Sequence, residues 1–297
     1  MIYNFFKRFI FILKYLLRDP LNFFFDLNKD FKKDKNSHKH KSTHYLVWCA
    51  GLPKSGSTLI EEIFEELPYV RVDQSLIRSF NNENLDHPHA IGENFFSSLP
   101  DKKYSFLKTH THYKKEYLNI AKKHEARIII SLRDIRDVMI SRYHHVLLDK
   151  NHWQHKYIYG LSFNEGFPRS LLQKKDQDYY KPIDLVYYWI RDWLKISREH
   201  DLLVLWYEDY IDNPINYINK ILTYIGFQNY SANDIHSNIL LNLKLKQKGL
   251  KANLSRFGRR KSTFRKGIKG EWEKHFDENM KKIFHSSLPG PIENILK

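Results

Sequence analysis

Two hydrophobic patterns alternate along most of the chain. Apolar runs with the length of buried strands occur at residues 45–50, 104–109, 127–132 and 202–207. Between them, apolar residues at helical spacing predict helices at 57–66, 134–148 and 184–200. Strands that are separated by amphipathic helices pair in parallel and are covered on both faces. The pattern therefore predicts an α/β domain with a central parallel sheet flanked by helices on both faces.

The predicted helix at 184–200 carries its largest side chains on one face. The residues expected in the core are Leu185, Tyr188, Trp189, Trp193 and Ile196. An aromatic stripe at this spacing is typical of a packed helix, so we assign these side chains to the core rather than to a ligand site.

The first 27 residues form a separate amphipathic pattern. Apolar side chains share one helical face at Ile2, Phe5, Phe6, Phe9, Leu13, Leu16 and Leu17. Lys7, Lys14 and Arg18 lie opposite, which is typical of a helix at a membrane surface and also of a helix packed on protein, so both interpretations stay open. Residues 28–44 are polar, rich in Lys and His, and aperiodic. We therefore divide the chain into an amphipathic helical extension (1–27), a polar linker (28–44) and a main domain (45–297).

Charge and cysteine content narrow the classes of partner. The 297-residue chain has a formal net charge of +15, which predicts an anionic partner such as nucleic acid, acidic lipid or a phosphorylated small molecule.

Cys49 is the single cysteine, which excludes an intramolecular disulfide and favours a reducing compartment. Charged residues interrupt the N-terminal apolar run, so no transmembrane span is expected there. We expect a cytoplasmic protein, with any membrane contact peripheral and made by residues 1–27.

The segment GLPKSGST, residues 51–58, follows the first predicted strand and precedes a predicted helix. Gly51, Gly56 and Thr58 fit the phosphate-loop template G-x-x-x-x-G-K-[ST], but Ser57 occupies the lysine position and the lysine is Lys54. Backbone N–H groups of such a turn, together with the dipole of the following helix, bind anions. The sequence predicts a P-loop-like fold whose displaced lysine reaches a different oxygen of the bound anion.

Further cationic residues follow other predicted strands, and in a parallel sheet these ends share one edge. Lys108 and His110 follow one strand, and Arg133 follows another with Ser141 two turns into the next helix. Near the C-terminus, the candidate anion-binding residues are Arg265, Lys266 and Gly267.

In order along the chain, these segments resemble the PAPS-dependent sulfotransferases, particularly the cytosolic type. The 5′-phosphosulfate loop of the family matches residues 53–58, and its K-T-H segment matches 108–110. Its 3′-phosphate signature matches Arg133, Asp137 and Ser141, and its Y-E-D segment matches 207–209. Its R-K-G-x-x-G-D-W ending matches 265–272, with Glu271 in place of Asp. The resemblance spans roughly Tyr45 to Phe276.

The resemblance implies that PAPS, an adenosine with a 3′-phosphate and a 5′-phosphosulfate, donates a sulfuryl group to a hydroxyl or amine. It implies that the 5′-phosphosulfate is held by Lys54, Ser55, Gly56, Ser57 and Thr58. It implies that the 3′-phosphate is bound by Arg133, Ser141, Arg265, Lys266 and Gly267. Tyr207 is then expected at the adenine, Lys108 at the sulfuryl group and His110 as the general base, with His112 as the alternative base. No metal is expected to take part in the transfer.

Two other functions remain as alternatives. A metal-dependent kinase or NTPase would have an anion loop of this kind, but its lysine would lie at position 57. A non-catalytic protein that binds membranes or nucleic acid is consistent with the net charge alone.

The histidines His144, His145, His152 and His155 are assigned to an acceptor-side loop rather than to zinc, because no cysteines accompany them. The acceptor is expected to be a small molecule, a sugar or a lipid rather than nucleic acid, and the pattern leaves it and the oligomeric state open. Walls of its pocket are expected from residues 72–100, 144–160 and the region after Leu240.

Overall fold

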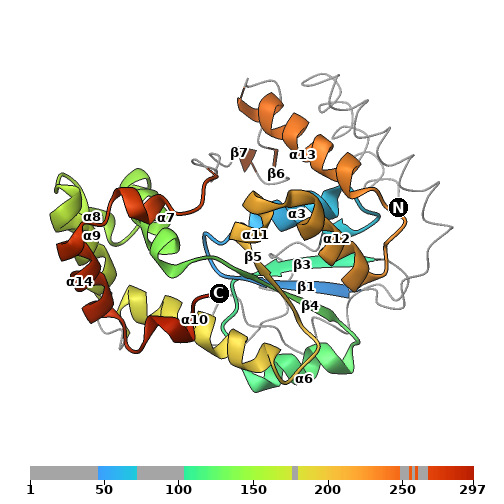
Figure 1. The fold of residues 1–297 in the computed structure, drawn as a ribbon, viewed down its shortest axis with the longest axis horizontal. Coiled ribbons are helices and arrows are strands. Elements are labelled where there is room, and N and C mark those ends of the chain that lie inside the picture. Colours follow the sequence, from blue (N-terminus) through green and yellow to red (C-terminus); the bar gives the residue numbers. More distant parts are fainter. Residues whose placement is uncertain (1–45, 72–103, 176–179, 248–253, 256–257, 260–266) are drawn as a thin grey trace, which may run out of the picture.

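The structure is a computed structural model. It describes residues 46–71, 104–175, 180–247, 254–255, 258–259 and 267–297 (Figure 1). The predicted N-terminal extension and linker, the acceptor-wall segment 72–100, and Arg265 and Lys266 lie outside the described residues. Among the described residues, no helix combines the length and the hydrophobicity that crossing a bilayer requires.

A five-stranded parallel sheet forms the centre of the molecule. Its strands are β1 (Leu46–Gly51), β2 (Val70–Arg71), β3 (Ser105–Thr109), β4 (Arg127–Leu132) and β5 (Leu203–Trp206), in the order β2-β3-β1-β4-β5. Every pairing in this sheet is parallel, and the central strand β1 lies between β3 and β4. The predicted parallel sheet is confirmed. A two-stranded antiparallel pair, β6 (Leu254–Ser255) and β7 (Gly258–Arg259), is separate from it.

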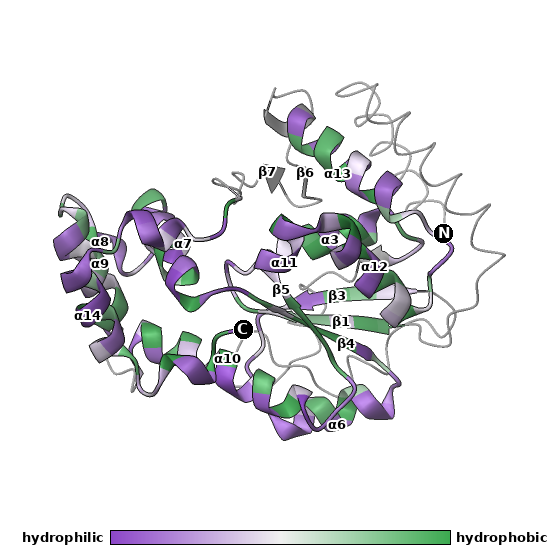
Figure 2. Ribbon diagram, in the orientation of Figure 1, coloured by the Kyte–Doolittle hydropathy of each residue, from purple (hydrophilic) through white to green (hydrophobic). Residues whose placement is uncertain are grey.

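Helices cover both faces of the sheet, because side chains alternate along each buried strand. On β1, Val47 and Cys49 pack against the helices α3 (Ser57–Glu65), α12 (Pro214–Ile225) and α13 (Ala232–Gln247). Trp48 and Ala50 face the other way, toward α6 (Lys115–Lys123) and α10 (Pro182–Ser197). Figure 1 shows these two layers on opposite sides of the strands, and Figure 2 shows the hydrophobic colour along β1 and β4.

A group of helices extends beyond the carboxyl end of the sheet. It contains α7 (Ile135–Leu148), α8 (His155–Ile158), α9 (Phe163–Leu172) and α14 (Glu278–Ser287), as Figure 1 shows. The remaining elements are α11 (Tyr207–Asp212) and the 3₁₀ turns η1 (Glu271–Lys274) and η2 (Ile292–Asn294). Tyr143 of α7 meets Phe163 and Phe167 of α9 edge-on, and these side chains belong to the same hydrophobic cluster as the buried face of α10.

The helix α10 differs from its prediction in its ends and in its buried face. It begins at Pro182, a residue suited to a first helical turn, and ends at Ser197. Trp193 is buried as expected, but Leu185 is 40% exposed. Tyr187, four residues after Ile183 on the inner face, is buried instead. The predicted core position of Leu185 was therefore wrong, because the buried face is centred about 100° around the helix from it.

Candidate active site at the carboxyl end of the sheet

The loop between β1 and α3 has the backbone of an anion-binding turn. Lys54 has a φ of 70° and Gly56 a φ of 85°, both in the left-handed region. Gly56 is the N-cap of α3 and forms no side-chain cap, so the positive end of the helix dipole faces the loop. Ser57 and Thr58 form the first turn of α3, the former buried and the latter exposed. The predicted strand, turn and helix are thus present.

The hydroxyl of Ser55 is directed into the protein. Its Oγ lies 2.6 Å from the carbonyl oxygen of Leu52, 2.8 Å from that of Ser131 and 2.9 Å from the Ser131 hydroxyl. In return, the Ser131 hydroxyl donates to the carbonyl oxygen of Ser55 at 2.9 Å. The structure therefore places the Ser55 side chain as an anchor that ties the loop to β4, a role that the sequence did not indicate.

Tyr207 closes the other side of the loop. A Cβ added to Gly56 would lie 2.5 Å from Cδ2 of Tyr207, so only a glycine allows this ring to approach so closely. The guanidinium of Arg133 lies 4.9 Å from the centre of the same ring. Gly56, Tyr207 and Arg133 follow β1, β5 and β4, and these contacts bring the three strand ends together.

Arg133 is buried and is held by three acceptors. Its Nη2 donates to the carbonyl oxygen of Ile268 at 2.9 Å and to Oδ2 of Asp137 at 3.3 Å, and Nη1 lies 3.5 Å from the carbonyl oxygen of Lys54. The bond to Ile268 ties Arg133 to the segment that begins at Gly267. Within the described part of the chain, the buried Nε–H of Arg133 has no hydrogen-bond acceptor. A buried cationic donor without an acceptor is costly, so this atom marks a place for an anion.

Asp137 fastens the C-terminal segment to α7. Its fully buried carboxylate accepts the N–H of Gly270 at 2.8 Å and the N–H of Trp272 at 3.0 Å, in addition to the ion pair with Arg133. The guanidinium of Arg136 also lies 3.8 Å from the Trp272 ring centre. Ser141 follows one turn after Asp137 on α7. The sequence placed Asp137 in a motif, but its spacing gave no sign of these donors.

The beginning of α7 is also fixed from α11, the helix that follows β5. Glu208 accepts the N–H of Asp134 through Oε1 at 3.0 Å, and Asp134 in turn caps α7 by accepting the N–H of Arg136 at 2.9 Å. Burial raises the pKa of the Glu208 carboxyl above its ordinary value. The Glu of the Y-E-D segment therefore orients the helix that carries Asp137.

Lys108 and Glu61 form a buried ion pair between β3 and α3. Both side chains are at least nine-tenths buried, and Nζ of Lys108 contacts Oε2 of Glu61. A buried pair of this kind is strongly destabilised by loss of one partner. The position of Glu61 on the apolar face of α3, among Ile60, Ile63 and Phe64, was a signal in the sequence that it needed a buried cation.

His110 lies against the first residue of the loop. Its Nδ1 is 2.6 Å from the carbonyl oxygen of Gly51, and a carbonyl oxygen only accepts, so Nδ1 carries the proton. In the neutral ring Nε2 is then the basic nitrogen. Burial lowers the pKa of His110 below its ordinary value, the bond to Gly51 opposes this, and the charges of Lys108 and Lys54 add to the lowering. The ring is thus kept neutral close to both lysines.

Two threonines beside His110 are fixed on the opposite side of β3. Trp48 donates its indole N–H to the Thr109 hydroxyl at 2.8 Å, and Trp193 donates to the carbonyl oxygen of Thr111 at 3.1 Å. The Thr111 hydroxyl donates to that of Thr109 at 2.8 Å. These bonds hold the two residues on either side of His110 in place.

Comparisons with known proteins agree with this arrangement. The model of the sulfotransferase domain family matches residues 45–288. Sulfotransferase 1A1 of the dog, Canis lupus familiaris, is 25% identical over 186 residues, which are 57% of this chain and 56% of that protein. The chain thus spans about half the length of this curated relative.

Solved structures share the fold. A mouse sulfotransferase complexed with PAP has a TM-score of 0.57 at 17% identity, over 81% of this chain and 82% of the other. A retinol dehydratase in complex with androsterone and inactive cofactor PAP has a TM-score of 0.51 at 22% identity, over 81% and 78%. Because the family model covers most of the chain, and the motif residues meet at one edge of a parallel sheet, this protein belongs to the sulfotransferase family.

Proposed function

We propose that this protein transfers the sulfuryl group of PAPS to a hydroxyl or amine of a small acceptor and releases PAP. The observation that carries the proposal is the convergence of three groups at the neighbouring strands β3, β1 and β4. His110 follows β3, Lys54 lies in the anion loop after β1, and Arg133 with its buried Nε–H follows β4.

The residues present fit both ends of this donor. The loop around Gly56 offers backbone N–H groups and a helix dipole to the 5′-phosphosulfate, with Thr58 at its exposed side. Arg133 offers Nε–H to the 3′-phosphate, and Gly267 and Ser141 complete that end together with Arg265 and Lys266. When bound, PAPS supplies a sulfuryl group on a phosphate leaving group.

His110 acts as the base. Its Nε2 takes the proton from the acceptor hydroxyl while the acceptor oxygen forms a bond to sulfur and the bond from sulfur to the bridging oxygen breaks. The bond from Nδ1 to Gly51 fixes the required tautomer, and the lowered pKa keeps Nε2 unprotonated at neutral pH. This contact favours His110 over His112, and general base catalysis contributes about 10²–10⁴-fold.

The two lysines stabilise negative charge. Lys54 neutralises the bridging oxygen as it becomes part of the 5′-phosphate of PAP, and a donor aimed at developing charge contributes about 10²–10³-fold. Lys108, held by Glu61, keeps a positive charge beside His110 and the transferring sulfuryl group. Tyr207, packed on Gly56, provides a ring at the adenine side.

The acceptor is proposed only as a class. A small hydroxyl compound, a sugar or a lipid headgroup fits the mechanism, and the related retinol dehydratase structure contains androsterone.

We propose a cytoplasmic location, with residues 1–27 at a membrane surface as the peripheral contact. Deletion of residues 1–27 is expected to release the protein from anionic vesicles in a flotation assay, and unchanged flotation contradicts the membrane contact.

The experiment uses PAP and two variants. PAP at 100 times its Kd is expected to stabilise the folded protein by about 2.7 kcal/mol, seen as a rise in Tm. Arg133→Gln should abolish the rise relative to its own unliganded Tm, whereas the exposed Arg191→Gln should retain it. His110→Gln should keep the rise but lower transfer from labelled PAPS to an acceptor panel by about 10²–10⁴-fold. No rise of the wild-type Tm at saturating PAP refutes the proposal.

A further inference from the structure

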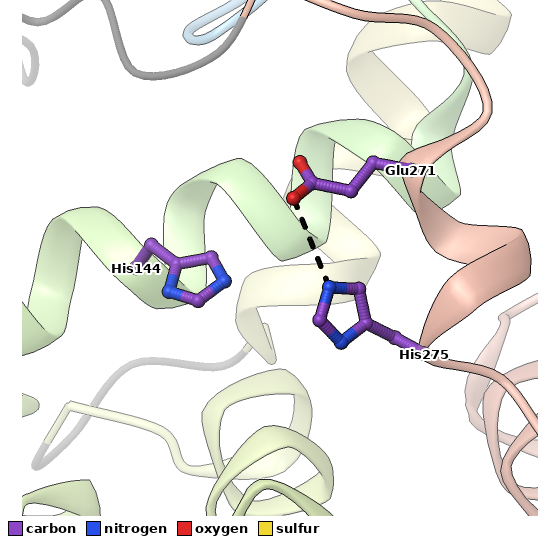
Figure 3. A group of neighbouring side chains, drawn as sticks. All are labelled: His144, Glu271 and His275. Carbon is purple, nitrogen blue, oxygen red and sulfur yellow. Dashed lines mark ion pairs between the residues drawn. The ribbon is translucent and has the colours of Figure 1, made fainter.

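Three side chains of the kinds that bind metal ions meet between α7 and the segment η1. His144 lies on α7, Glu271 begins η1 and His275 follows it, and one ligand atom from each lies within 4.8 Å of the other two. Figure 3 shows both imidazole rings and the carboxylate pointing toward a shared space. We propose that this group binds a Zn²⁺ ion, separately from the residues assigned to sulfuryl transfer.

The spacing of the ligand atoms is close to that of a zinc site. Zinc bonds of about 2.0–2.2 Å in tetrahedral geometry place neighbouring ligand atoms about 3.3 Å apart. Nε2 of His275 and Oε1 of Glu271 are 3.7 Å apart, and Glu271 and His275 are four residues apart in sequence, which places them on one face of the turn. Closing separations of up to 4.8 Å takes side-chain movements of about 1 Å.

The chemistry of the group also favours zinc. Two imidazoles and one carboxylate are the ligands of known three-residue zinc sites, with a water in the fourth position. The Glu271 side chain is only 1% exposed, and nearby positive charge favours the ionised form of a carboxylate at this depth. A divalent ion held by neutral imidazoles supplies that charge. The ring of Phe163, 4.9 Å from that of His275, covers the group with apolar surface.

The three side chains lie where α7 meets the C-terminal segment, so a bound ion would join these two parts of the chain. Asp137 already joins α7 to the N–H groups of Gly270 and Trp272, and the zinc site adds a second connection between the same two segments. It lies on the C-terminal side of Gly267. Zinc binding is therefore expected to restrain the segment 267–276 against α7.

Zinc binding is measured on the full chain, free of any affinity tag and treated with chelator. His38, His40 and His44 are replaced by Gln in the background protein, because this His-rich stretch is a second source of ligands. Titration with Zn²⁺ alone, followed by calorimetry, is expected to give one ion per chain, and Co²⁺ should give the visible absorption of a tetrahedral site. Neither titration requires PAP, so the result is independent of the proposed transferase activity.

Variants distinguish this site from surface binding. His275→Gln and Glu271→Gln should each lower the zinc affinity by at least about 100-fold, because each removes a ligand. His285→Gln, at an exposed histidine of α14, should leave it unchanged. The Tm of each variant without ligand reports its folding, and His144→Gln gives an independent test from the other segment. Absence of zinc binding by the background protein, or equal affinities of His275→Gln and His285→Gln, overturns the proposal.

Discussion

Replacement of Gly56 by Ala tests the contact that joins the anion loop to Tyr207. Gly56 has a φ of 85°, and a Cβ there would lie 2.5 Å from Cδ2 of Tyr207. Gly160 has a φ of 79° and nothing within 4 Å of an added Cβ, so it is a matched control. Ala in this left-handed conformation costs about 1–2 kcal/mol at either position. The smaller entropy of the unfolded chain returns about 0.4–1 kcal/mol in both variants.

Only Gly56→Ala also forces the Tyr207 ring to move. Overpacking of this kind costs about 1–3 kcal/mol, so Gly56→Ala is expected to be less stable than Gly160→Ala by that amount. Urea unfolding of both variants measures the difference in the free energy of unfolding. Because Arg133 packs on the same ring, the PAP-induced rise in Tm should also shrink in Gly56→Ala alone. Equal stabilities and equal PAP responses in the two variants refute this reasoning.

Three further predictions follow from other buried groups. Asp137→Asn should destabilise the protein by about 3 kcal/mol, because it breaks a buried ion pair and sets an amide N–H₂ against backbone donors. Asp192→Asn, in an exposed ion pair, should cost at most about 1 kcal/mol, and equal urea midpoints for the two variants contradict this prediction. Burial lowers the pKa of His110, so its basic form persists further on acidification than that of an ordinary histidine. The midpoint of the loss of single-turnover transfer should lie below about pH 6.5, and a midpoint above that pH argues against His110 as the base. Cys49 is fully buried, and burial raises the pKa of its thiol to about 12. In urea, a thiol reagent should therefore label Cys49 no faster than the protein unfolds, and rapid labelling without denaturant contradicts its burial.

The sequence predicted the elements of the sheet because each strand has a local signature. The apolar runs around Val47 and Ile129 became central strands, and the glycine and lysine of the loop became the turn before α3. Arg133 and His110 were correctly placed at strand ends, since the carboxyl ends of parallel strands share an edge.

Side-chain direction within the site could not be predicted in the same way. The inward turn of Ser55 depends on Ser131 of the neighbouring strand, and the ion pair of Lys108 depends on how α3 lies over β3. Likewise, the ligand group of His144 forms with Glu271 and His275, which are distant along the chain. A hydrophobic pattern contains the period of each element but not the contacts between elements.

The central position of β1 has a consequence for synthesis of the chain. β1 is the first strand of the sheet to be made, but its two neighbours, β3 and β4, come much later in the sequence. At ribosomal rates of about 5–20 residues per second, roughly 4–16 seconds separate the completion of β1 from that of β4. During that interval an apolar segment that includes Trp48 and Cys49 has no complete sheet to enter. We therefore expect the nascent chain to depend most on chaperones before Leu132 has emerged.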